Sequence, residues 1–285
     1  MADNQKMWEE LGMNLELHDQ LCQVLPQAVG DVFLSQENRP DGMDYYDMVV
    51  ADIHGIRPSE LIEHQKKGGK VFGTFCVYVP DEVIFAADAI ATGLCGGSQF
   101  WVPGGEKVLP NNTCPLIKAS VGARLDRTCP FFRIADMYIG ETTCDGKKKA
   151  WEILSEDVPI HVMDLPQMKR AKDVKAWAEE IKELIHVVEE FTGNKVTAEK
   201  LAESIKLINN KRKALDRLYA CRKNEKLPIS GTDALVISQI AFYDDPARFA
   251  QMTNKLCDEL EQRIKDGVSV VPEGTKRIML TGTPL

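Results

Sequence analysis

Short β-rich runs alternate with helical stretches between residues 71 and 165, and this alternation constrains the fold more than any other feature of the chain. The β-rich runs are residues 71–78, 134–143 and 159–165, and the helical stretches are residues 81–91, 115–125 and 147–154. Strands that alternate with helices along a chain are typical of a sheet with helices on both faces. The pattern therefore predicts an α/β fold.

The segments that flank this region lack strand signals. Apolar positions at helical spacing predict a first helix over residues 5–25, and proline and glycine predict mostly loop and short structure over residues 26–57. A short helix is expected over residues 59–67. After Pro166 the sequence becomes charged and periodic, so residues 167–268 are predicted to form a helical segment.

A new β-rich run, Lys276 to Gly282, follows the helical segment, and the chain stops at Leu285. A lone strand has no pairing partner, so we expect a second α/β domain that is cut short here. The predicted domains are a first helix plus an α/β unit, a helical segment and one strand of a second unit: 1–166, 167–268 and 275–285.

Composition and charge exclude several classes of function. The formal net charge is −8 and no long basic run occurs, which disfavours a nucleic-acid partner. No apolar run approaches the roughly 18 residues that span a bilayer, and residues 1–25 are polar and amphipathic, unlike a signal peptide. The sequence therefore predicts a cytoplasmic protein that binds neither nucleic acid nor membrane.

Five of the eight cysteines lie within 69 residues. These are Cys76, Cys95, Cys114, Cys129 and Cys144. Three of them, Cys76, Cys114 and Cys144, come shortly before a predicted helix, where the partial positive charge of the helix N-terminus favours a thiolate and suits an anionic ligand. In a reducing cytosol such a cluster indicates metal or redox chemistry rather than disulfides.

The spacing of these cysteines leaves two interpretations open. Successive cysteines are 19, 19, 15 and 15 residues apart, so the short Cys-x-x-Cys pairs of zinc ribbons and ferredoxins are excluded. Separate loops at the carboxyl ends of strands can assemble one metal or iron–sulfur site. Alternatively, the cysteines are scattered, buried and serve as small hydrophobes. Packing is the interpretation for the three cysteines on periodic helices, Cys22, Cys221 and Cys257.

Charged residues near Cys144 carry similar alternatives. Glu141 ends a predicted strand and is a candidate acid–base group or a group that orients a ligand, or else an ordinary solvated carboxylate. The lysines at 147–149 either screen an anionic group or form the solvated first turn of a helix. The five histidines show no paired spacing, and His161 is interpreted as structural.

Three long motifs contain the cysteines at 76, 114 and 144, namely Phe72–Glu82 (FGTFCVYVPDE), Leu109–Ser120 (LPNNTCPLIKAS) and Gly140–Lys149 (GETTCDGKKK). These motifs resemble the 2-hydroxyacyl-CoA dehydratase/benzoyl-CoA reductase component family. The second and third are most similar to the double-cubane cluster proteins of that family. The similarity runs from about residue 70 to the end of the chain and includes the segment His161–Pro166.

The resemblance implies two Rossmann-like (flavodoxin-like) domains, a helical segment and an iron–sulfur cubane in the cleft between the domains. In the double-cubane group two cubanes share a bridging sulfide, and each takes three cysteines. By resemblance, Cys76, Cys114 and Cys144 are the cluster ligands of the first domain, with Cys95 and Cys129 as second choices.

The implied function is that of an oxygen-sensitive iron–sulfur reductase, expected as a homodimer. It would receive low-potential electrons from a separate ATP-hydrolysing activator that carries its own four-iron cluster. One alternative is a subunit of a 2-hydroxyacyl-CoA dehydratase, and another is a cluster-carrying electron-transfer or scaffold subunit without its own chemistry. Because a second domain would supply further ligands, the chain by itself is expected to be inactive or incomplete.

Overall fold

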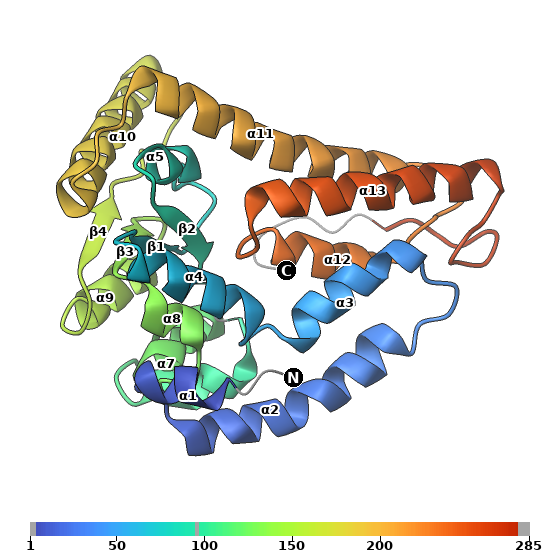
Figure 1. Cartoon of the computed structure of the whole chain (residues 1–285), viewed down its shortest axis with the longest axis horizontal. Coiled ribbons are helices and arrows are strands. Elements are labelled where there is room, and N and C mark those ends of the chain that lie inside the picture. Colours follow the sequence, from blue (N-terminus) through green and yellow to red (C-terminus); the bar gives the residue numbers. More distant parts are fainter. Residues whose placement is uncertain (1–3, 95–96, 279–285) are drawn as a thin grey trace.

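Four short strands form one parallel sheet in the computed structural model, which describes residues 4–94 and 97–278 (Figure 1). The strands are β1 (Val71–Thr74), β2 (Ile90–Gly93), β3 (Met137–Glu141) and β4 (Ile160–Met163). Their order is β2-β1-β3-β4, and Phe72 is paired with Ala91 of β2 and with Met137 of β3. The predicted α/β class is therefore confirmed.

Side-chain alternation along the strands divides the core between the two faces of the sheet. Tyr138 and Ile139 are neighbours in β3, yet they belong to different hydrophobic clusters because successive side chains of a strand point to opposite faces. The Tyr138 face is covered by α4 (Ile56–Lys66), α7 (Pro115–Leu125), α8 (Pro130–Ile134) and α9 (Asp145–Leu154). The Ile139 face is covered by α5 (Asp81–Ala86) and α10 (Ala171–Thr192).

Helices make up most of residues 167–268, as the sequence predicted. They are α10, α11 (Ala198–Cys221), α12 (Gly231–Ile240) and α13 (Pro246–Lys265). Side-chain caps start three of these helices, from Thr197, Ser230 and Asp245. In Figure 1, α11 runs from beside α5 to α13, so this long helix joins the sheet to the helical part of the molecule.

Packing crosses residue 166 in both directions. Leu184 and Val188 of α10 lie in the core of the sheet. In the opposite sense, Met43 and Tyr46 pack with residues of α11–α13 such as Phe249. Tyr46 comes from α3 (Asp44–Ala51), within the stretch that was predicted to be mostly loop. That stretch also contains η1 (Gly30–Leu34) and η2 (Asp41–Met43), and burial against the helical core explains why it folds despite its prolines and glycines.

Two further differences from the sequence prediction have local causes. The helix expected over residues 5–25 is interrupted at Gly12, whose φ is +64°, and is divided into α1 (Gln5–Glu10) and α2 (Leu15–Val29). The helix expected over residues 81–91 ends at Ala86, because Asp88 takes a left-handed φ of 57° and residues 90–93 pair with β1 as β2.

The glycine-rich stretch after β2 also folds. It forms η3 (Gln99–Trp101) and α6 (Val102–Glu106), and α6 lies directly against α7. A Cβ on Gly105 would lie 2.1 Å from the carbonyl oxygen of Lys118, so the approach of the two helices depends on glycine.

The end of the chain contributes no strand within the described residues. Residues 276–278 of the predicted final strand have no regular secondary structure, and its remainder lies outside the residues that the structure describes. No helix in the described part of the chain combines the length and apolar character needed to cross a bilayer.

Candidate functional site

Two of the three cysteine segments leave the sheet at the same edge. Cys76 follows the end of β1 by two residues, and Cys144 follows the end of β3 by three. Because β1 and β3 are adjacent and parallel, their carboxyl ends meet at one edge, where α/β sheets bind ligands.

The third cysteine segment reaches this edge through α7. Cys114 is the N-cap residue of α7, as Cys144 is of α9. A Cβ added to Gly146 would lie 2.7 Å from Cδ1 of Ile117 and 3.9 Å from Sγ of Cys144, so the first turns of the two helices are in contact. Phe75, Ile117 and Lys147 line one small hollow there. Neighbours of all three cysteines therefore meet at what we call the cysteine edge: the loops after β1 and β3 and the start of α7.

The helix starts at the cysteine edge suit an anionic group. Cys114 and Cys144 are exposed and Cys76 is half-buried. Among the described residues, no side chain caps the N-terminus of α7 or of α9, so the N–H groups of both first turns can donate to sulfur. Neither Thr143 nor Asp145 caps α9. Thr143 instead donates to Oε1 of Glu141 at 3.3 Å.

The two second-choice ligands differ from these three. Cys95 lies outside the described residues. Cys129 is only 7% exposed and belongs to the hydrophobic core beneath α7 and α9. Burial raises the pKa of the Cys129 thiol to about 11, which opposes the thiolate form that binds iron. This setting argues against Cys129 as a ligand.

Glu141 is fully buried at the carboxyl end of β3. Its Oε1 accepts from Lys147 Nζ and Thr143 Oγ1, and its backbone carbonyl accepts from Trp151 Nε1 at 2.9 Å. Its second oxygen, Oε2, is buried and has no hydrogen-bond partner among the residues that the structure describes. A solvated carboxylate, one of the alternatives from the sequence, is therefore excluded. An unfilled acceptor is costly in a protein interior and often marks a functional site.

The three lysines after Cys144 do not act alike. Lys147 turns inward to Glu141 and lies 5.8 Å from the centroid of the Trp151 ring. Lys148 and Lys149 instead form exposed ion pairs with Asp145 and Glu152, at 3.5 and 2.9 Å. Only the first of the three lysines therefore contributes to the interior of the site.

A hollow of about 390 Å³ lies beside the cysteine edge. Its lining includes Tyr78, Thr143, Leu165, Met168 and Trp177. A hydrogen bond of 2.7 Å from the Thr142 hydroxyl to Asp164, and one of 2.9 Å from the Leu165 amide to that hydroxyl, hold the loop after β4 against the loop after β3. Thr143 belongs both to this hollow and to the hydrogen bonds of Glu141, so the hollow can present a small molecule to the cysteine edge.

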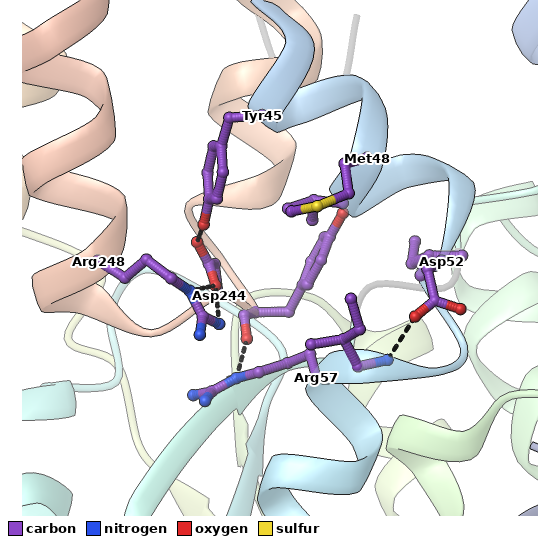
Figure 2. A pocket seen from close by; sticks show the side chains of 10 residues that line it. Tyr45, Met48, Asp52, Arg57, Asp244 and Arg248 are labelled. Carbon is purple, nitrogen blue, oxygen red and sulfur yellow. Dashed lines mark hydrogen bonds and ion pairs between the residues drawn. The ribbon is translucent and has the colours of Figure 1, made fainter. Parts of the chain in front are cut away.

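A second, smaller hollow has a different character (Figure 2). It measures about 80 Å³ and lies between α3, the start of α4 and residues 243–248. Arg248 contacts both Asp244 and Glu60, Tyr45 donates to Asp244, and the Arg57 side chain donates to the Tyr243 carbonyl at 2.8 Å. These polar groups bind one another, so we interpret this region, called the helical joint below, as structural.

The donor set at the cysteine edge fits an iron–sulfur cluster. Thiolates are the ligands that hold such clusters, and uncapped N–H groups hydrogen-bond to their sulfurs. The three edge thiols do not form a tight group with ligand atoms within 4.8 Å of one another, as a single ion requires. A cubane is itself larger than one ion, so its ligands stand farther apart.

A compact group of ligand atoms does occur elsewhere among the described residues, at His18, Cys22 and His54. Sequence analysis missed it, because His54 is 36 residues from His18 and packing was the interpretation for Cys22. The spacing of His18 and Cys22, four residues apart on one helix, was the available signal.

Comparison with known proteins identifies relatives over most of the chain. The sequence model of the family "2-hydroxyglutaryl-CoA dehydratase, D-component" matches residues 76–285. "Putative dehydratase subunit YjiM" of Escherichia coli (strain K12) is 34% identical over 79% of this chain and 59% of its own length. A benzoyl-CoA reductase subunit of Thauera aromatica is 26% identical over 59% of this chain and 44% of its own length.

The beta subunit of (R)-phenyllactyl-CoA dehydratase from Clostridium sporogenes is 22% identical over 78% of this chain and 58% of its own length. In each alignment the chain spans less than two thirds of the relative.

Proposed function

The chain belongs to the 2-hydroxyglutaryl-CoA dehydratase D-component family, and from that membership we propose that it is the cluster-binding component of a low-potential iron–sulfur reductase. Cys76, Cys114 and Cys144 would hold the cluster, as cubane or double cubane. Bound there, the cluster would supply one-electron transfer at low potential. The convergence of the three cysteine segments at one sheet edge is the observation that carries the proposal.

The surrounding residues have separable roles in this proposal. Amides of the first turns of α7 and α9 would donate to the ligand sulfurs, which tunes the reduction potential and orients the thiolates. Glu141 would hold or release a proton at its unpartnered Oε2, while Lys147 keeps Oε1 fixed. The hollow lined by Tyr78, Thr143 and Trp177 would bind the small-molecule substrate.

The wider assembly is also part of the proposal. The strand order β2-β1-β3-β4 agrees with the first four strands of the flavodoxin-like order, which supports that fold for the sheet. A separate ATP-hydrolysing activator with its own four-iron cluster would supply the electrons, and a second copy of the chain would form a homodimer. Ligands beyond the three edge cysteines would complete a double cubane.

Counting iron and acid-labile sulfide per chain after anaerobic purification and reconstitution tests the proposal. We expect iron in the wild type and its loss in Cys76→Ser, Cys114→Ser and Cys144→Ser. Cys221→Ala is the matched control, because Cys221 lies in the helical core, away from the edge. A wild type without iron, or edge variants that keep the iron content of Cys221→Ala, would reject the proposal.

A second candidate function is a subunit of a 2-hydroxyacyl-CoA dehydratase. The names of two relatives, both dehydratase subunits, favour it. Equilibrium dialysis with an acyl-CoA separates the two candidates, because the dehydratase subunit requires a site for the thioester. Met168 is 57% exposed in the wall of the hollow, so Met168→Glu should preserve the fold and abolish acyl-CoA binding there. Absence of binding by the wild type would favour the reductase.

A further inference from the structure

Two histidines and a cysteine converge between α2 and the turn after α3, and none of them belongs to the cysteine edge. Nε2 of His18 lies 2.9 Å from Nδ1 of His54, and Sγ of Cys22 lies 3.6 Å from Nε2 of His18. All three ligand atoms fall within 4.8 Å of one another. His18 is fully buried, His54 is 9% exposed and Cys22 is half-buried.

We propose that His18, Cys22 and His54 form a binding site for a single Zn²⁺ ion that fastens α2 to the turn after α3. Imidazole nitrogen and thiolate sulfur are the donors that Zn²⁺ prefers. The proposal is independent of the cluster function, since it uses none of the edge cysteines.

The distances agree with this ion. Metal–nitrogen bonds of about 2.0–2.1 Å and a metal–sulfur bond of about 2.3 Å require tetrahedral N···N and N···S separations of about 3.3 and 3.6 Å. Sγ of Cys22 lies 3.6 Å from Nε2 of His18, and the ligand atoms of all three residues lie within 4.8 Å of one another. The N···N distance is 2.9 Å, so the rings need to part by only about 0.4 Å when an ion replaces the hydrogen bond between them.

The ligands are also held in place from outside the site. His18 and Cys22 are four residues apart on α2, which puts both on one face of the helix. The ring centroids of Trp8 and His18 lie 4.3 Å apart, and Nε1 of Trp8 donates to the His54 backbone carbonyl at 2.8 Å. One tryptophan of α1 therefore positions both histidines.

Binding of Zn²⁺ changes the proton count of only one of the three ligands. Both imidazole rings bind the ion in their neutral form. Zn²⁺ binds cysteine as the thiolate, so binding releases one proton from the Cys22 thiol. The hydrogen shared by the two rings moves to the outer nitrogen of its own ring. Three protein ligands leave a fourth position for water.

The test is a titration of the chelator-treated 285-residue chain with Co²⁺, followed by Zn²⁺ as competitor. Cys76, Cys95, Cys114 and Cys144 are all replaced by serine in this background, so that the cysteine edge cannot bind the probe. We expect one Co²⁺ per chain, a sulfur-to-cobalt charge-transfer band and displacement by Zn²⁺. Absence of that band overturns the proposal, whatever the iron content of the edge variants.

Variants of the ligands sharpen the test. Cys22→Ser should remove the charge-transfer band, and Cys22→Ser and His54→Gln should each weaken Zn²⁺ binding by at least about tenfold, the loss that even outer residues of metal sites cause. His186→Gln, on the exposed side of α10, is the matched control. If His54→Gln fails to fold, Cys22→Ser decides alone. Ligand variants that match His186→Gln in affinity and spectrum would overturn the site.

Discussion

The cysteine edge and the helical joint each contain a buried carboxylate beside a cation. The two carboxylates differ in how many of their oxygens accept hydrogen bonds. The side chain of Asp244 in the joint is 2% exposed, and that of Glu141 at the edge is fully buried. Both oxygens of Asp244 accept hydrogen bonds, from Arg248, the Asp245 amide and the Tyr45 hydroxyl. Glu141 has one oxygen filled and one without a partner.

This difference agrees with a structural role for the joint and supports the functional role that we propose for the edge. In the joint, Tyr45 and Arg248 are directed at Asp244, the Arg57 Nε at the Tyr243 carbonyl and Asp52 at the Ile56 amide, so these groups are held by partners within the protein (Figure 2). At the edge, the described residues include a carboxylate oxygen without a partner, two helix N-termini without a side-chain cap and two exposed thiols. Groups that the protein leaves unsatisfied are available to a ligand, at some cost in stability.

The largest expected effect is on the joint. Asp244→Asn should lower the free energy of unfolding by about 3 kcal/mol, because it leaves part of a buried ion-pair network without its anion. Urea denaturation followed by circular dichroism measures this change. Asp258→Asn is the control, since Asp258 is 72% exposed beside Arg217 and its loss should cost no more than about 1 kcal/mol. Equal effects of the two substitutions would contradict the structural role of the joint.

The cysteines should differ in reactivity along the same division. Burial raises the pKa of Cys257, in the helical core, to about 12, whereas Cys114 and Cys144 are exposed at the edge. Each pKa unit lowers the thiolate fraction about tenfold, so iodoacetamide at pH 8 should modify the edge pair at least about a hundredfold faster than Cys257. Mass spectrometry of a time course measures the rates. Similar rates for all three cysteines would show that the edge is not open in this way.

A smaller effect is expected for the matched substitution at the edge. Glu141→Gln should lower the free energy of unfolding by about 1 kcal/mol, less than Asp244→Asn, because only one oxygen of Glu141 has partners to lose. The same urea experiment compares the two variants directly. A loss equal to that of Asp244→Asn would mean that Glu141 is as fully satisfied as a structural carboxylate, and the proposed proton-handling role would lose its support.

The smallest effect concerns pH. Burial opposes ionisation of Glu60, but hydrogen bonds from Arg248 and Arg57 outweigh it and lower the pKa of this carboxyl. A pKa lowered on folding gives stability that is present above the unfolded value and is lost as pH falls through the folded value. The urea concentration at half-unfolding should therefore decrease as the pH is lowered below about 4.5, the ordinary carboxyl range. The decrease should be smaller in Glu60→Gln. Glu152→Gln, at an exposed position, should show the same pH dependence as the wild type. If Glu60→Gln also showed the pH dependence of the wild type, the joint would make no contribution.

Much of the fold was predictable because its signals are local. The helix at residues 115–125 was predicted with the bounds that α7 has, since Pro115 and the apolar spacing lie within that segment. The strand β2 was missed, because a short apolar run such as residues 90–93 fits a helix or a strand equally well until β1 pairs with it. Likewise, nothing near Met43 and Tyr46 in the sequence indicates that α11–α13 will bury them.

By itself, the sequence determined which residues can carry chemistry: three cysteines in recognisable segments, two of which are N-caps of α7 and α9. Tertiary structure alone decided the surroundings, namely the pairing of buried Glu141 with Lys147, the burial of Cys129 and the meeting of His18 with His54. The physical reason is range. Caps and strand signals arise between close neighbours in the chain, whereas burial and the contact between His18 and His54 depend on segments that only folding brings together.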